Sequence, residues 1–281
     1  MPAALITGAS TGIGRASTLR LARSGWTVLA GVRDAAAGEQ LREQVPPGRV
    51  VPVELDVTDA AQVTAAAALV SDGAGGEAGR LDALVNNAGI GLGGPLELIA
   101  PEDWRRQFEV NVFGQIAVTR ALLPALRRAR GRIVFVSSIG GFITMPFTAP
   151  YGASKHAIEA IADSLRIELV SSRVKVVLIE PGSVSTPIWD KTRAETARLE
   201  VPPELDPVYG RAVSTAEKAI EETARRGMSP DVVAAVIERA LSARRVRARY
   251  VVGRDARVML ALKRLLPDLV FDRMLRRALG L

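Results

Sequence analysis

The sequence predicts an α/β fold, in which one doubly wound parallel sheet is covered by helices on both faces. Short apolar runs alternate with longer stretches of helical spacing through the first two thirds of the 281 residues. These runs show little polar alternation, as expected for strands buried on both faces. Hydrophobic residues make up 48 % of the chain, enough for one large core. We therefore expect residues 1–281 to form a single domain.

Seven strands are predicted, in chain order, from the runs AALIT, WTVLAGV, RVVPVELDV, LDALVNNAG, RIVFVSS, VKVVLIEPG and ARYVVG. Helices are expected between them at about 13–24, 35–44, 59–71, 101–129 and 150–171. Pro101 suits the first position of its helix because that position needs no N–H donor. The tract GAGGEAG at 73–79 is typical of a loop.

The pattern changes after the sixth strand. Residues 183–229 combine several prolines with charged helical turns and follow the carboxyl end of a strand, where open α/β sheets bind ligands. This segment is predicted to be a substrate lid. Residues 254–281 form a basic, apolar-rich tail that Pro267 divides into two short helices. Such a tail can pack over the substrate pocket or a neighbouring subunit, or lie on an anionic membrane.

Composition excludes several classes of function. The chain has no cysteine and one histidine, so disulfides, thiolate chemistry and a His-rich metal site are not expected. The net charge of +7 is dispersed, aromatic residues are only 4 %, and no nucleic-acid-binding motif occurs, so no nucleic-acid partner is expected. Neither a signal peptide nor a membrane-spanning segment is predicted. The expected location is cytoplasmic, with the tail as a peripheral membrane contact.

A glycine-rich loop follows the first predicted strand. Gly8, Gly12 and Gly14 lie in TGASTGIG, between that strand and a helix. Glycines permit a tight turn and close backbone approach, while the helix N-terminus offers free N–H groups and a positive dipole end to a pyrophosphate. This strand–loop–helix context predicts a dinucleotide site.

Tyr151 and Lys155 lie one helical turn apart in YGASK, so both project from one helix face. Free tyrosine has a pKa of about 10, and a nearby ammonium lowers it toward the range useful for proton transfer. Ser138 ends the strand RIVFVSS, where its hydroxyl can bind a substrate oxygen, with Ser137 as the alternative. By itself, YxxxK also occurs on ordinary helices. His156 is expected on the helix surface.

Five motifs together resemble the short-chain dehydrogenase/reductase family. They are TGASTGIG, NNAG at 86–89, NVFG at 111–114, YGASK at 151–155 and PGSVST at 181–186. The stretch VSSIGGFITMPFTAPYGASKHAIEA is most similar to the 17β-hydroxysteroid and retinol dehydrogenase branch. The resemblance covers about residues 3–190. It implies a Rossmann-type fold, hydride transfer between a nicotinamide and a carbonyl or secondary alcohol, and homodimers or homotetramers built on the helices at 101–129 and 150–171.

The resemblance also implies the site residues. The catalytic set would be Asn111, Ser138, Tyr151 and Lys155, with Asn111 holding a water on the proton path to Lys155, and Lys155 also binding the nicotinamide ribose. Asn86 would border the adenosine or else hold the central sheet together. The cofactor-binding set would be Gly8, Ser10, Thr11, Gly12, Ile13, Gly14, Arg33, Asp56, Val57, Asn87, Ala88, Gly89, Asn111, Tyr151, Lys155, Pro181, Gly182, Val184 and Thr186.

The end of the second strand bears on the choice of cofactor. Val32 stands where NAD-type relatives carry an acid, and Arg33 follows it. Because arginine binds phosphate through two parallel hydrogen bonds, NADP(H) is favoured. NAD(H) is the alternative, since Arg33 can also be a solvated loop residue paired with Asp34.

The expected pocket rim is apolar and has few charges to bind a carboxylate or phosphate. It comprises Gly93, Pro95, Leu96, Phe142, Met145, Phe147, Val184, Ile188 and Trp189, several of which can equally pack in the core. This favours an apolar ketone, aldehyde or secondary alcohol of steroid, retinoid or lipid type. Two alternatives remain: an NAD(P)-dependent epimerase or dehydratase on the same fold, and a non-enzymatic dinucleotide sensor.

Overall fold

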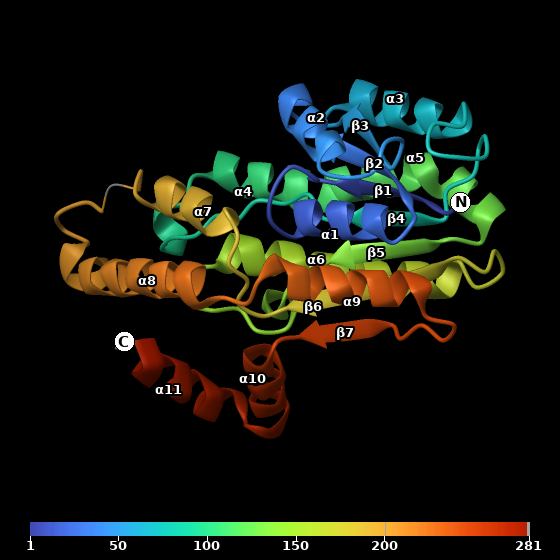
Figure 1. Ribbon diagram of the computed structural model, residues 1–281. Helices are drawn as coiled ribbons and strands as arrows, with labels where there is room; N and C mark the ends of the chain where they lie inside the picture. Colours follow the sequence, from blue (N-terminus) through green and yellow to red (C-terminus); the bar gives the residue numbers. More distant parts are fainter. Residues whose placement is uncertain (200, 280–281) are drawn as a thin grey trace.

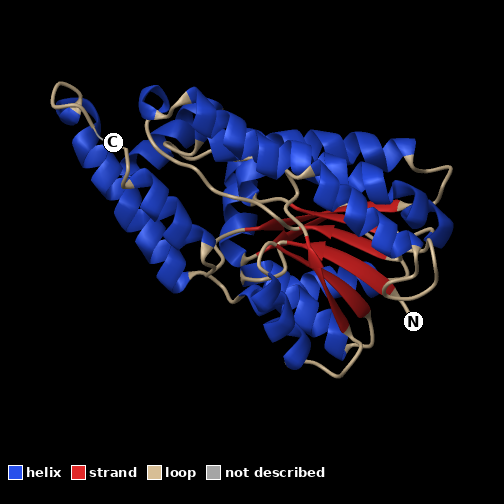
Figure 2. Cartoon of the chain, turned by 90° about the horizontal axis from the view of Figure 1, so that it is seen from above, coloured by secondary structure: helices blue, strands red, loops and turns tan. Residues whose placement is uncertain are grey.

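The computed structural model describes residues 1–199 and 201–279 and contains one seven-stranded sheet. Every strand pairing is parallel and the spatial order is β3-β2-β1-β4-β5-β6-β7, which confirms the predicted doubly wound sheet. The strands are β1 (Ala3–Thr7), β2 (Thr27–Val32), β3 (Val50–Glu54), β4 (Ala83–Asn86), β5 (Arg132–Val136), β6 (Lys175–Pro181) and β7 (Arg249–Val252). Figure 2 shows the sheet enclosed between helices.

The helices before β6 follow the predicted spans closely. They are α1 (Gly12–Arg23), α2 (Ala35–Glu43), α3 (Ala60–Ser71), α4 (Pro101–Phe108), α5 (Gly114–Ala129) and α6 (Ala149–Glu168). Asp34 and Asp59 cap α2 and α3, because each carboxylate accepts a hydrogen bond from a free backbone N–H in the first turn. Pro101 occupies the start of α4, as expected.

One predicted helix differs from expectation. The span 101–129 is not one regular α-helix, because α4 and α5 are separated by a π-helical turn at Glu109–Phe113. A π-turn inserts one extra residue per turn and therefore rotates the side chains that follow. This turn carries Asn111.

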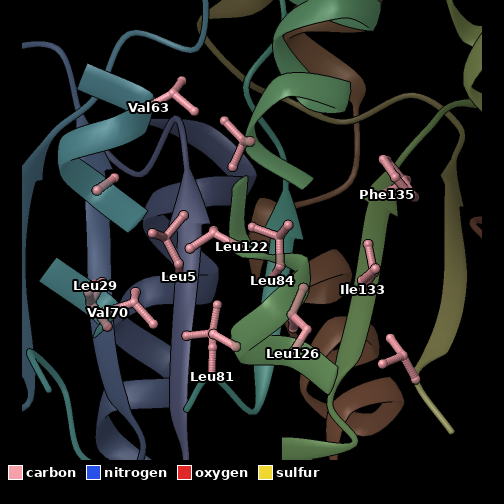
Figure 3. Packing of buried hydrophobic residues seen from close by; sticks show 14 of the residues in the cluster. Leu5, Leu29, Val63, Val70, Leu81, Leu84, Leu122, Leu126, Ile133 and Phe135 are labelled. Atoms are coloured by element: carbon pink, nitrogen blue, oxygen red, sulfur yellow. The ribbon is translucent and has the colours of Figure 1, made fainter. Parts of the chain in front are cut away.

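Two apolar layers cover the two faces of the sheet. On one face, α3, α5 and α6 pack against alternate strand residues, and Figure 3 shows part of this layer around Leu5, Leu84 and Phe135. On the other face, α1, α2 and α9 (Pro230–Ser242) pack against the intervening residues. Because neighbouring strand residues face opposite ways, both layers draw on the same apolar runs. The absence of polar alternation in these runs follows directly.

The chain after β6 builds helices beyond the carboxyl edge of the sheet. The segment predicted as a lid contains α7 (Ile188–Thr196) and α8 (Asp206–Arg226). After β7, α10 (Arg254–Leu265) and α11 (Asp268–Leu279) form a hairpin around Pro267, as predicted. Figure 1 shows this hairpin beyond β7, with α11 returning toward α8. No helix in the described parts of the chain is long and apolar enough to span a membrane.

Candidate active site

The loop between β1 and α1 forms a cradle of backbone atoms. Gly8 and Gly12 have φ values of +64° and +54°, a region that side chains strongly disfavour. A Cβ atom on Gly14 would collide with the Gly8 carbonyl oxygen. Thr11 precedes α1 without capping it through its side chain, so N–H groups of the first turn remain available. These features fit the pyrophosphate of a dinucleotide.

The NNAG turn holds this loop in place. The Asn87 side-chain amide donates to the carbonyl oxygens of Thr7 and Gly8, at 3.0 and 3.1 Å. The Thr7 hydroxyl accepts hydrogen bonds from the backbone N–H groups of Asn87 and Ala88. Asn86 is fully buried and donates to the Thr119 hydroxyl at 2.8 Å. This bond ties β4 to α5, and the interpretation that Asn86 borders the adenosine stays a prediction.

Arg33 and Asp56 lie together beyond the ends of β2 and β3. Their charged atoms are 4.0 Å apart, and the Arg33 side chain is 70 % exposed. Burial opposes ionisation of Asp56, but hydrogen bonds from Thr58 and the charge of Arg33 lower its pKa. Asp34, the alternative partner of Arg33, uses its carboxylate to cap α2. An accessible guanidinium at the end of β2 fits the extra phosphate of NADP(H).

Val57 belongs to the core. It is 4 % exposed and packs where a Cβ atom on Gly114 would otherwise lie. Its side chain therefore cannot contact a cofactor, and only its backbone remains for that role.

Ser138 and Tyr151 meet at the carboxyl end of β5. Both side chains lie against Gly140, where a Cβ atom would be 3.2 Å from the Tyr151 ring and 3.4 Å from the Ser138 hydroxyl oxygen. Ser138 also accepts a hydrogen bond from the Gly140 N–H at 3.0 Å, which fixes its rotamer. Ser137, the alternative, is 3 % exposed and faces Glu159. Ser138 is thus the serine placed beside Tyr151.

Lys155 is buried beneath Tyr151. Its Nζ donates to the Val136 carbonyl oxygen at 2.9 Å and lies 5.7 Å from the centre of the Tyr151 ring. Burial lowers the pKa of Lys155 to about 8, against the opposing effect of Glu159. Burial also raises the pKa of Tyr151, although its bond to Ser138 opposes this. The expected lowering of the Tyr151 pKa by Lys155 is therefore not seen in this arrangement, since Lys155 is directed to a backbone carbonyl.

Asn111 connects the π-turn to the catalytic helix. Its side-chain oxygen accepts from the Ile90 N–H at 2.8 Å, and its amide donates to the Ile90 carbonyl and the Ser154 hydroxyl. Ser154 directly precedes Lys155 and donates in turn to the Tyr151 carbonyl. These contacts satisfy the buried amide and bring Asn111 next to the helix segment that carries Tyr151 and Lys155. Gly89 lies against the same side chain.

The segment after β6 returns to the glycine loop. A Cβ atom on Gly12 would lie 3.1 Å from the Thr186 side chain, so the PGSVST and TGASTGIG motifs are in contact. The buried Val184 accepts a hydrogen bond from the Trp189 indole through its carbonyl. Gly182 leaves room for Asp255 of α10, which accepts a hydrogen bond from the Ser183 N–H at 2.8 Å. Sequence inspection did not single out Asp255.

The predicted rim residues lie in different surroundings. Phe142 and Met145 pack against the α10–α11 hairpin around the buried Phe271. Phe147, at φ +64°, contacts the ring of Tyr209 in α8 edge-on. Leu96 is 67 % exposed and lies outside this apolar cluster. The positions of the others are as follows: Gly93 accepts a hydrogen bond from Thr196, Ile188 faces Gly91, and Pro95 is buried.

His156 lies on the exposed side of α6, and its Nδ1 is 2.9 Å from the Gly152 carbonyl oxygen. It is a satisfied surface histidine, as expected.

Comparison with known proteins gives a consistent assignment. The family model described as short chain dehydrogenase matches residues 2–197. The chain is 34 % identical to an NADPH-dependent 3-dehydrocapnine reductase of Ornithobacterium rhinotracheale, over 96 % of this chain and 94 % of that protein. It is 38 % identical to human retinol dehydrogenase 16, over 95 % and 85 % of the two chains. A short-chain dehydrogenase/reductase from Burkholderia phymatum in complex with NAD superposes with a TM-score of 0.78, at 30 % identity and 94 % and 92 % coverage.

A glycine cradle and a Ser–Tyr–Lys cluster at one sheet edge define a nicotinamide-dependent oxidoreductase. The chain belongs to the short-chain dehydrogenase/reductase family, and the relatives include the retinol dehydrogenase and 17β-hydroxysteroid dehydrogenase branch that the sequence resembles.

Proposed function

We propose that the protein is an NADPH-preferring reductase of apolar aldehydes or ketones. The observation that supports this most directly is the convergence of Ser138, Tyr151 and Lys155 with the glycine cradle. Burial raises the pKa of Tyr151, so its hydroxyl is protonated at neutral pH and ready to act as the donor. Arg33, the accessible cation beyond β2, supports the preference for the phosphorylated cofactor.

Ser138 and Tyr151 both act on the carbonyl oxygen of the substrate. NADPH, which the glycine cradle and Arg33 would hold, would supply the hydride to the carbonyl carbon. Ser138 and Tyr151 donate hydrogen bonds to the carbonyl oxygen and stabilise the negative charge that develops on it. Tyr151 then transfers its proton to that oxygen, which gives the alcohol and leaves a phenolate. The Lys155 ammonium, which donates to the Val136 carbonyl before the reaction and lies 5.7 Å from the centre of the Tyr151 ring, would stabilise the phenolate once it forms, until Tyr151 regains a proton.

Substrate preference follows from the walls around this oxygen. Phe142 and Met145 are half-buried in an apolar cluster that continues into Phe271 and Met274 of the hairpin. Such walls favour an apolar substrate. The nearby cations Arg249 and Lys263, 5.7 and 5.2 Å from the ring centres of Phe142 and Phe271, are paired with carboxylates of the protein. Retinol dehydrogenase 16, a relative, is named for an alcohol of this kind.

The segment 183–229 would act as the lid. The hydroxyls of Thr192 and Thr196 in α7 donate to the carbonyls of Gly91 and Gly93, and Glu195 pairs with Arg106 of α4 at 3.0 Å. These contacts hold α7 over the segment that follows β4. Closure there would exclude water from the reacting carbonyl.

The decisive variant is Tyr151→Phe. It keeps the ring that packs against Gly140 but removes the proton donor, so NADPH-dependent reduction of retinal or a ketosteroid should fall about 10²–10⁴-fold while NADPH binding stays unchanged. Full turnover in this variant would refute the assignment. A substrate panel in which small charged keto acids are better substrates than apolar carbonyls would refute the substrate class.

Two surfaces suit the expected partners. Phe113 in the π-turn, Ile116 in α5, and Ile167 and Val170 at the end of α6 are exposed apolar residues, which suit contact with a second copy of the chain. At the hairpin tip, Leu265 and Leu269 are each 80 % exposed among basic residues, which suits peripheral contact with an anionic membrane. Light scattering, which measures the mass of the protein in solution, tests the contact between copies of the chain. Sedimentation with phosphatidylserine vesicles, compared for the wild type and a Leu265→Glu/Leu269→Glu variant, tests the second.

A further inference from the structure

A buried charge cluster lies directly behind the reactive pair. Glu159, one helical turn after Lys155 on α6, is 5 % exposed, and Glu180 at the end of β6 is fully buried. Arg249, the first residue of β7, lies between them: its Nε is 3.2 Å from an oxygen of each carboxylate. Its Nη2 is 2.7 Å from both oxygens of Asp163, one turn further along α6.

Glu159 and Lys155 contact adjacent residues of one strand end. Lys155 donates to the carbonyl of Val136, and Glu159 lies against Ser137 and Gly141, where no room remains for a Cβ atom. Side chains four residues apart on a helix are neighbours. The two charged groups do not form an ion pair, because the Lys155 ammonium is directed to Val136 and the Glu159 carboxylate to Arg249, so Glu159 acts on Lys155 through its charge alone. Its negative charge opposes the loss of the Lys155 proton that burial favours.

Arg249 influences which of the two buried carboxylates, Glu159 or Glu180, is ionised. Two buried carboxylates beside one guanidinium repel each other. Burial and the charge of Glu159 raise the pKa of Glu180 to about 7. Burial also raises the pKa of Glu159, but the Ser137 hydroxyl and Arg249 oppose this shift. Glu159 accepts a hydrogen bond from Arg249, whereas neither side-chain oxygen of Glu180 has a hydrogen-bond partner among the described residues, and this geometry favours the charge on Glu159, the member next to Lys155.

The ionisable groups around the cluster come from four elements, and one aromatic ring adds a further contact. They are Lys155, Asp163 and Arg166 on α6, Glu180 on β6, Arg249 on β7 and Arg264 on α10, with the ring of Phe142 5.7 Å from the Arg249 guanidinium. Asp163 is paired with Arg249 and Arg166, and Arg264 acts on Glu180. Of the charged groups in and around the cluster, Glu159 is the one that affects Lys155: its negative charge raises the pKa of Lys155.

We propose that Glu159 is a positioning residue of the reaction, which holds Lys155 in its charged form, and that Arg249 of the last strand fixes Glu159 for this task. The inference rests on the proposed function, in which Lys155 stabilises the Tyr151 phenolate. It extends the proton-transfer machinery through α6 to the last strand of the sheet. Glu159 contacts neither Tyr151 nor the reacting carbonyl, so it acts through Lys155.

The titration of Lys155 tests this without a substrate. The chain has five lysines, so ¹³C-lysine labelling gives few ε-carbon NMR signals, and Lys155→Met assigns the relevant one. In Glu159→Gln, the midpoint should fall by up to about 2 pH units, the size that Coulomb's law gives for two unit charges on the order of 6 Å apart at an effective dielectric constant of about 20. Glu180→Gln is the matched control: it removes the other carboxyl of the cluster and should leave the midpoint unchanged.

Each outcome of the titration either supports or overturns the proposal for Glu159. A lower midpoint in E159Q with no change in E180Q supports the proposal; no change in E159Q, or equal shifts in both variants, overturns it. If E159Q does not fold, Arg249→Lys replaces it. That variant keeps the charge but loses the forked contacts, so the Lys155 midpoint should fall by a smaller amount, and an unchanged midpoint there would overturn the proposal.

Activity separates this inference from the proposed function. In E159Q the alkaline limb of kcat/KM for carbonyl reduction should move to lower pH, because the Tyr151–Lys155 pair loses its proton more easily once the negative charge is gone. If the wild type reduces no carbonyl, the proposed function fails while the NMR titration still reports on Glu159. If the wild type reduces carbonyls but the alkaline limb of kcat/KM is unchanged in E159Q, the proposal for Glu159 is wrong and the proposed function still stands.

Discussion

Glu180→Gln should make the protein more stable at alkaline pH. The Glu180 side chain is 1 % exposed, and burial together with Glu159 raises its pKa from 4.5 to about 7. The folded protein therefore holds this proton more tightly than the unfolded chain. Stability from this group is fully present below pH 4.5, falls as the pH rises toward 7, and is constant above. At 1.36 kcal/mol per pKa unit, the loss amounts to about 3 kcal/mol.

Glutamine keeps the shape of the protonated acid and cannot ionise, so E180Q avoids this loss. Urea denaturation followed by tryptophan fluorescence should give nearly equal unfolding free energies for wild type and E180Q at pH 4.5. At pH 8, E180Q should be more stable by up to about 3 kcal/mol. A variant less stable than wild type at pH 8 would contradict the reasoning. It would mean that Arg249 stabilises ionised Glu180 by more than its burial costs.

Three further outcomes are expected. Gly14→Ala places a Cβ atom against the Gly8 carbonyl oxygen, so it should cost about 1–3 kcal/mol and weaken NADPH binding in a fluorescence titration. Gly76→Ala, where a Cβ atom would make only ordinary contacts at 3.8 Å or more, should do neither. Arg33→Ala should raise KM for NADPH at least about tenfold, the loss of one charge-assisted contact, and leave KM for NADH unchanged. Phe271→Ala removes a 2 % exposed ring from the hairpin, a local loss of about 3–5 kcal/mol, and should raise KM for an apolar carbonyl while NADPH affinity stays constant.

Local patterns predicted the parts of the site that lie on adjacent residues. The glycine loop was predictable because the positive φ of Gly8 and Gly12 and the tight packing of Gly14 each demand the residue type present. Tyr151 and Lys155 were predictable because helical spacing places them on one face. The strands could be assigned because both of their faces are buried, which leaves uninterrupted apolar runs.

Other features depend on contacts between distant parts of the chain. No residue in EVNVF predicts a π-turn. The turn is stabilised by the hydrogen bonds of Asn111 to Ile90 and Ser154. The direction and the charge state of the Lys155 ammonium could not be predicted from the spacing of the motif either. Spacing placed its ammonium near Tyr151, but its direction is set by the Val136 carbonyl and its charge by burial and Glu159.

The last strand and the hairpin reach the active site by three separate contacts. Arg249 pairs with α6 behind Lys155, Asp255 holds the N–H of Ser183 in the PGSVST turn, and Phe271 packs under the segment that follows Ser138. Each contact ends on a different segment of the site: the proton relay, the turn that reaches the glycine loop, and the substrate wall. A tail that served only as a membrane contact would need none of them. The inner face of the C-terminal region, β7 included, therefore packs against three segments of the proposed site.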